Sequence, residues 1–162
     1  MALPDAKIIE LVKKSGILTD TAVAKAEQYA VRAKTSSLVS AFLESGVLRE
    51  DQLGGIIAGY YNVPYITLAK ISIPPEVARI IPEKVARRSK SFAFARERDG
   101  VKGALSDPSN KAVLSMVARK TGERAIPYFA FEKDIEGTVV LYKKALQKTI
   151  DELKAGTGMP SE

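Results

Sequence analysis

The sequence predicts an α+β fold in which a four-helix subdomain precedes a small three-stranded sheet flanked by helices. Up to residue 60, apolar residues recur with the period of a helix, and glycines fall where one helical pattern ends and the next begins. Between residues 91 and 105 the apolar period falls to two, which is typical of strands. The bounds that we expect are residues 1–62, residues 63–154 and a small, polar, disordered tail, residues 155–162.

Four helices joined by short turns are expected in the first subdomain. Polar residues open them, namely Asp5, the pair Thr19-Asp20, Ser36 or Ser37, and the pair Glu50-Asp51. Gly16 and Gly46 end the first and third helices. The inner apolar stripes are Ile8, Leu11 and Val12, then Val23 and Ala26, then Leu38, Ala41 and Phe42, then Leu53, Ile56 and Ile57.

An internal repeat relates the two halves of this subdomain. The segments Gly16-Ile17-Leu18 and Gly46-Val47-Leu48 lie thirty residues apart, each between one helix and the next. Val23 and Leu53 occupy equivalent positions after them. The repeat predicts two helix–glycine–helix hairpins that pack against each other as a small bundle.

The second subdomain is expected to run helix, strand, strand, helix, strand, helix. Pro82 opens the first helix, and the alternation of Phe92 and Phe94 with alanines predicts a strand with two unlike faces. Asp99-Gly100 predicts a tight hairpin turn before a returning strand, Val101 to Leu105. Residues 65–68 are a candidate short edge strand.

Three further elements complete this subdomain. Pro127, inside a β-rich run of residues 125–131, favours an edge strand or a bulge. The helix before it opens near Ser109 and ends at Gly122, with the stripe Ala112, Leu114, Val117 and Ala118. The last helix starts at Glu132, with the stripe Ile135, Val139, Leu141 (or Val140) and Leu146.

The composition excludes several kinds of catalytic site. The chain has no cysteine and no histidine, so it has no thiol nucleophile and lacks the usual zinc ligands. It contains no Gly-x-x-x-x-Gly-Lys-Ser/Thr loop, the phosphate cradle of nucleotide hydrolases. Asp107, next to Pro108, is better explained as the carboxylate that fixes a strand-to-helix turn. We therefore expect no enzyme activity, no metal and no cofactor.

The run from Ile80 to Asn110 resembles a known family. Its ordered signals match the second half of the N-terminal domain of type II secretion and type IV pilus assembly ATPases, at Pro82, Glu83, Ala86, Arg87, Asp107, Pro108 and Asn110. The resemblance extends from about Asn62 to Leu146. It implies a cytoplasmic interaction module that docks onto an inner-membrane platform protein or a regulator, and so reaches the inner membrane through a partner. Two interpretations fit: an N-terminal portion of such an ATPase, or a separate relative that works with a motor ATPase.

The resemblance also raises an alternative function, because some members bind the second messenger cyclic di-GMP through two repeats that each begin Arg-Leu-Gly. The equivalent candidate positions here are Lys7, Gly16, Leu18, Leu38, Gly46 and Leu48. However, the chain has Lys7-Ile8-Ile9 and Ser37-Leu38-Val39 where Arg-Leu-Gly belongs, and Ala30 and Tyr60 at the final glutamine positions. Lysine supplies charge without the bidentate fork of arginine, so we expect this ligand site to be lost.

Two surfaces are candidates for partner binding. The first helix has a wide apolar face that includes Ile8, Ile9 and Val12. The net charge of +6 and a basic run with the candidates Arg87, Arg88, Lys90 and Arg98 suggest an acidic protein, a lipid headgroup or nucleic acid as the partner of a second face. The complete basic run is Lys84, Arg87, Arg88, Lys90, Arg96, Arg98 and Lys102, against Glu97 and Asp99. A solvated helix-and-hairpin surface explains the same run equally well. Core packing accounts for Phe92 and Phe94 better than base stacking does, so no specific nucleic acid is expected. A basic nucleic-acid-binding protein, which would bind through this charged face and depend on salt, is the third candidate function.

Overall fold

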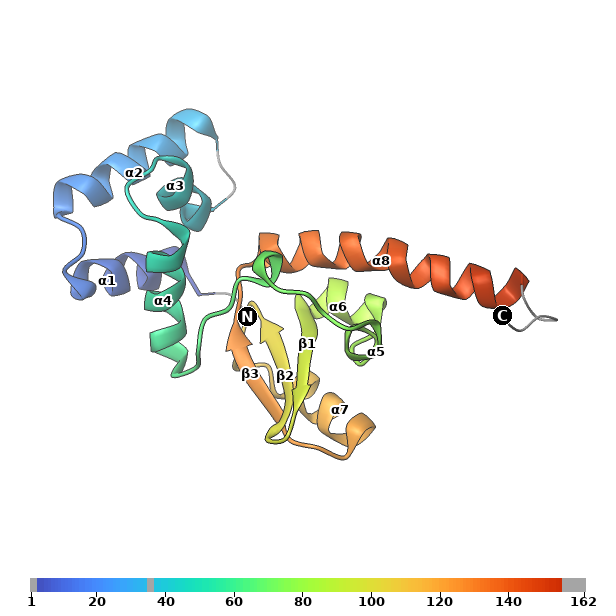
Figure 1. Ribbon diagram of the computed structural model, residues 1–162. Coiled ribbons are helices and arrows are strands. Elements are labelled where there is room, and N and C mark those ends of the chain that lie inside the picture. Colours follow the sequence, from blue (N-terminus) through green and yellow to red (C-terminus); the bar gives the residue numbers. More distant parts are fainter. Residues whose placement is uncertain (1–2, 35–36, 156–162) are drawn as a thin grey trace. The chain divides into compact units, whose positions relative to one another are not determined.

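The computed structural model describes residues 3–34 and 37–155, with side chains described up to residue 143 (Figure 1). The chain divides into two compact units, Met1–Tyr65 and Ile66–Glu162. In the described residues, the first unit is helical and the second holds a mixed three-stranded sheet with helices, so the predicted α+β class is confirmed. Of the predicted tail, only Ala155 lies within the described residues, as the last residue of the final helix.

The first unit consists of the four expected helices, α1 (Asp5–Ser15), α2 (Asp20–Ala33), α3 (Leu38–Glu44) and α4 (Glu50–Tyr61). Thr19 and Ser37 cap α2 and α3 as predicted, since each side-chain oxygen accepts an N–H bond of 3.1 Å from the residue three positions on. Asp5 does not cap α1: it is the first helical residue, and Pro4 precedes it without a side-chain cap. Arg49 takes the capping position at α4, one residue before Glu50, and Ser36 lies outside the described residues.

The core of the first unit follows the internal repeat. Residues at equivalent positions of the two hairpins, thirty apart in the sequence, are both buried. These positions are Ile8 and Leu38, Val12 and Phe42, and Val23 and Leu53. Gly16 and Gly46 both have positive φ, 74° and 80°. The predicted stripes are confirmed except at Leu11 and Ile56, which are only half-buried.

The second unit contains the predicted order of elements and two that were not predicted. The predicted ones are α6 (Glu83–Ser89), β1 (Ser91–Glu97), β2 (Gly100–Leu105), α7 (Lys111–Thr121), β3 (Ala125–Phe129) and α8 (Glu132–Ala155). The unpredicted ones are a 3-10 turn, η1 (Leu68–Lys70), and a short helix, α5 (Pro75–Ala78). The sheet order is β1-β2-β3, with β1 antiparallel and β3 parallel to β2. The prediction of a strand at residues 65–68 is wrong: Tyr65 forms an isolated bridge, and η1 begins at Leu68.

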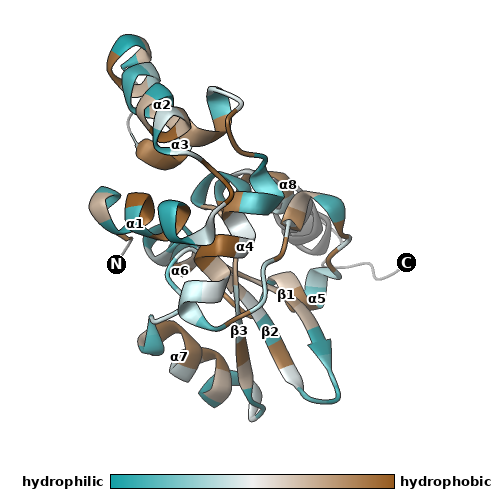
Figure 2. Cartoon of the chain, turned by 90° about the vertical axis from the view of Figure 1, so that its left-hand side faces the viewer, coloured by the Kyte–Doolittle hydropathy of each residue, from teal (hydrophilic) through white to brown (hydrophobic). Residues whose placement is uncertain are grey.

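Strand β1 differs from the alternating strand that the sequence predicts. All four residues from Ser91 to Phe94 are buried, because elements cover both faces of the sheet at this point. A register shift between Ala93 and Ala95 leaves Phe94 as a bulge residue, whose ring lies 5.0 Å from the ring of Tyr128. In Figure 2 the strand colours change from hydrophobic to hydrophilic toward the hairpin end of β1.

The hairpin turn, the cap of α7 and the apolar stripe of α7 are each shifted from their predicted positions. Glu97 pairs with Gly100, so the turn residues are Arg98 and Asp99, and Gly100 already belongs to β2. Asn110, rather than Ser109, caps α7. Val113 is buried in α7 where the predicted Ala112 is exposed.

Helix α8 uses the predicted Ile135 and Val139 in the core, but neither Leu141 nor Val140. These two side chains are 67% and 56% exposed. Tyr142 takes the next inward position, and its hydroxyl oxygen accepts a 2.9 Å hydrogen bond from the amide of Ile73. The side chain of Leu146 lies outside the described residues.

Candidate functional site

Lys7, the first candidate ligand position, is already engaged by its own unit. Its ammonium lies 5.1 Å from the ring centroid of Tyr60 and 3.3 Å from a carboxylate oxygen of Glu10. Lys7 lies at the start of the first repeat, and Tyr60 lies at the final position of the second. The fold therefore brings the two ends of the repeat pair into contact. A cation over an aromatic ring is favourable, and here it uses the charge that a phosphate would need.

The other candidate ligand positions serve the fold. Leu38 and Leu48 are buried in the core, and Leu18 is half-buried. Gly16 and Gly46 lie at the ends of α1 and α3. The residues at the Arg-Leu-Gly positions also have structural roles. Ser37, at an arginine position, caps α3. Ile9 and Val39, at the glycine positions, have half-buried side chains that cover backbone which glycine would leave accessible.

The apolar face of α1 is narrower than the sequence suggests. Ile8 and Val12 are 4% and 0% exposed, which makes them core residues and removes them as contacts for a partner. Ile9 is half-buried and retains exposed surface, as does Leu11. Of the three predicted contact residues on α1, the structure leaves Ile9.

The basic run is largely neutralised by nearby carboxylates. Four of its members form ion pairs or charged hydrogen bonds, namely Arg87 with Glu83 at 2.7 Å, Lys90 with Glu136 at 3.0 Å, Arg96 with Glu123 at 2.9 Å, and Lys102 with Glu97 at 2.6 Å. The hydrogen bond from Arg87 lowers the pKa of Glu83 below its usual value. Lys84, Arg88 and Arg98 are exposed and form no ion pair within the described part of the chain.

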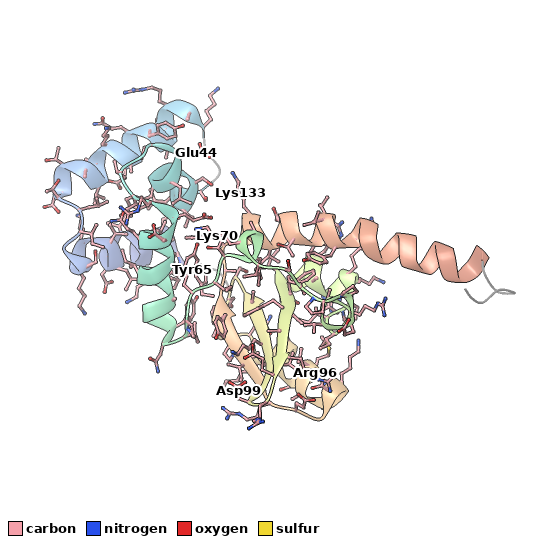
Figure 3. The ribbon with its side chains drawn as sticks, viewed as in Figure 1. Glu44, Tyr65, Lys70, Arg96, Asp99 and Lys133 are labelled. Carbon is pink, nitrogen blue, oxygen red and sulfur yellow. The ribbon has the colours of Figure 1, made fainter. Side chains whose placement is uncertain are left out.

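The basic residues also do not form one face. Arg87, Arg88 and Lys90 belong to α6 and its end, where β1 begins, whereas Arg98 lies in the turn beyond the other end of β1. Figure 3 shows Arg96 and Asp99 at this hairpin end of the second unit. A strand rises about 3.3 Å per residue, so the length of β1 separates the two groups by roughly 20 Å. The candidate residues therefore divide into an α6 group and a hairpin group.

Two carboxylates that could suggest catalysis fix the backbone instead. Asp107 accepts a 3.1 Å hydrogen bond from the amide of Ser109, the turn-fixing role that the sequence predicts. Asp134, which sequence reasoning missed, accepts bonds of 2.6 and 3.2 Å from the amides of Leu68 and Ala69 and so holds η1. Partial burial raises the pKa of Asp134, although both amide bonds oppose the shift. Acidic residues are common in the first turn of a helix. The sequence around Asp134 therefore does not indicate that its side chain binds amides 65 and 66 residues earlier in the chain.

Within the described residues, no three or more acidic side chains gather in a way that would hold a metal ion. None of the helices in that part of the chain is long and apolar enough to span a bilayer.

Comparison with known proteins decides the family. The MshEN domain family matches residues 61–154, which is more than half of the 162 residues. The chain belongs to the MshEN domain family. The resemblance to the N-terminal domains of secretion and pilus ATPases is thereby confirmed.

Relatives of this MshEN domain include a type IV pilus assembly ATPase, PilB of Myxococcus xanthus strain DK1622. It is 21% identical over 149 residues, which is 92% of this chain and 26% of PilB. The chain thus spans about a quarter of that relative. A solved structure of MshE with cyclic di-GMP matches with a TM-score of 0.58 and 21% identity, over 83% of this chain and 97% of that one. The N-terminal domain of XpsE matches with a TM-score of 0.50 and 15% identity, over 86% and 96% of the two chains. These two structures show the same fold.

Proposed function

We propose that this MshEN domain is a non-catalytic docking and regulatory module of a type II secretion or type IV pilus machine. The observation that carries the proposal is the family match over residues 61–154, joined to a relative that is a pilus assembly ATPase. Its partner is a platform or regulatory protein of the inner membrane, which it meets on the cytoplasmic side. A motor ATPase supplies the nucleotide hydrolysis, either in the same protein or as another chain.

The roles of the charged side chains support a non-catalytic function. Asp107 and Asp134 are occupied by backbone amides, and the chain has neither histidine nor cysteine to act as a base or nucleophile. We therefore infer that the described residues form no nucleophile–base pair. Binding, rather than turnover, is the function that these residues allow.

For this proposal we choose the apolar surface of Ile9 on α1 as the partner contact. Replacing Ile9 with glutamate is expected to weaken capture of the platform protein at least tenfold, about 1.4 kcal/mol, because a carboxylate there would be desolvated on binding. The measurement is a pull-down with the tagged chain from a detergent extract of source-cell membranes, with captured proteins identified by mass spectrometry. Val31→Glu is the matched control: it adds the same charge on α2, where Val31 is 81% exposed.

Folding and docking are separated by melting each variant. Ile9→Glu should melt within a few degrees of the parent, since Ile8 and Val12 rather than Ile9 fill the core. If Ile9→Glu unfolds the first unit, or binds as tightly as Val31→Glu does, the contact does not lie on α1. In that case Arg88→Glu tests the α6 group, where Arg88 is exposed.

Cyclic di-GMP binding is the second candidate function, because a structural relative, MshE, is solved with that ligand. We expect titration calorimetry to show no binding at micromolar concentrations. Charge-assisted hydrogen bonds contribute roughly 1.5–3 kcal/mol each, so replacing the arginine forks with Lys7 and Ser37 would weaken binding about tenfold to a hundredfold or more. Micromolar binding that Lys7→Ala abolishes would contradict this expectation and favour a receptor function.

A further inference from the structure

The outer edge of β3 has a defined pattern of backbone groups. The amide of Val101 donates to the carbonyl of Arg124 at 2.8 Å, and the amide of Ala130 donates to the carbonyl of Leu105 at 3.2 Å. In a parallel ladder, alternate residues of a strand bond to its neighbour. With the register Val101↔Ala125 to Leu105↔Phe129, the even-numbered residues bond to β2, and the backbone groups of Ala125, Pro127 and Phe129 point away from it.

Pro127 occupies the middle of this outward-facing series. It has no N–H to donate, and at this position the loss costs no bond to β2. The carbonyl of Phe129 accepts a 3.0 Å hydrogen bond from the amide of Ile66, which covers one end of the edge. An added strand would need a donor at the centre of the edge, and Pro127 removes it.

The opposite edge of the sheet is interrupted as well. Strand β1 carries the Phe94 bulge, and the exposed charged residues Arg96 and Glu97 follow it. Bulges, charges and prolines are the features by which proteins protect edge strands from pairing with another chain. Both outer strands of this small sheet have at least one of them.

We propose that Pro127 closes the β3 edge to strand addition by a second copy of this chain. The sheet can then contact another copy only through its side chains and not through backbone hydrogen bonds at its edge. This inference goes beyond the docking role proposed above, because it excludes pairing of edge strands. A second copy of this chain therefore cannot extend the sheet at β3.

The test replaces Pro127 with valine, which restores the missing N–H in a residue that favours strands. Sedimentation velocity over a range of concentrations is expected to show about a tenfold increase in the associated fraction over the parent protein. Pro127→Ala serves as a second variant with a smaller side chain, in case valine disturbs packing. If both variants fold and remain as monomeric as the parent, the proposal is wrong.

A pair of new prolines tests the direction of the backbone groups. Ala125→Pro removes an outward N–H, so adding it to Pro127→Val should return the associated fraction to the parent level. Ile126→Pro removes an N–H that bonds to β2 and should instead unfold the β2–β3 ladder. If Ala125→Pro leaves the association unchanged, the edge of β3 is not where the copies meet, and the proposal is overturned.

Discussion

Replacing Gly100 with alanine is expected to destabilise the second unit by roughly 2–5 kcal/mol. Gly100 has a φ of +138°, which side-chain-bearing residues rarely adopt. A Cβ atom at this position would also collide with the backbone carbonyl oxygen of Arg124. That oxygen accepts the amide of Val101 at 2.8 Å, so it cannot move aside without loosening the start of the β2–β3 ladder.

The matched control for this prediction is Gly103→Ala in the same strand. Gly103 has no positive φ, and the nearest atom to its added Cβ is a side-chain carbon of Leu105 at an ordinary 3.6 Å. Guanidinium unfolding followed by circular dichroism should show a lower midpoint for Gly100→Ala and a change within about 1 kcal/mol for Gly103→Ala. Equal midpoints would mean that the chain relaxes around Gly100 at little cost.

The elements that depend on local sequence could be predicted. Thr19 and Ser37 cap helices with their own side chains, and Gly122 ends α7, so short-range chemistry places these boundaries. The repeat around Gly16 and Gly46 could also be predicted, because the same spacing of apolar residues occurs on both sides of each turn.

The features that depend on distant strands could not be predicted. The bulge at Phe94 arises from the register between β1 and β2, and the burial of Ser91 to Phe94 arises from elements on both faces of the sheet. The sequence Asp99-Gly100 indicates a hairpin, but the collision that reserves Gly100 for glycine comes from Arg124, which directly precedes β3. The link from Asp134 to Leu68 spans 66 residues, and no local pattern marks it.

The candidate site shows the same limit. Ile8 and Ile9 are identical neighbours in the sequence, yet one is core and the other keeps exposed surface, because the rotation of α1 is set by the helices it packs against. The basic run is continuous in the sequence, but β1 separates its ends in space. A run of basic residues in a sequence therefore does not show that these residues share one face of the folded protein.

The adjacent glycines of α4 should respond to alanine in opposite directions. A Cβ atom on the buried Gly54 would lie 2.5 Å from a ring carbon of Tyr65, whereas Gly55 is exposed with nothing within 4 Å of its added Cβ. Gly54→Ala is therefore expected to destabilise the first unit by about 1–3 kcal/mol through overpacking. Gly55→Ala should stabilise it by about 0.5–1 kcal/mol, because alanine loses less backbone freedom in a helix.

Chemical denaturation of both variants measures these changes, and a double-mutant cycle assigns the cause. With Tyr65 replaced by alanine, the ring that opposes the Cβ at position 54 is gone, so Gly54→Ala should become as favourable as Gly55→Ala. The cost of losing Tyr65 itself cancels in the cycle. If Gly54→Ala is stabilising even with Tyr65 present, the ring of Tyr65 moves aside at little cost. The contact between this ring and α4 would then not explain why glycine occupies position 54.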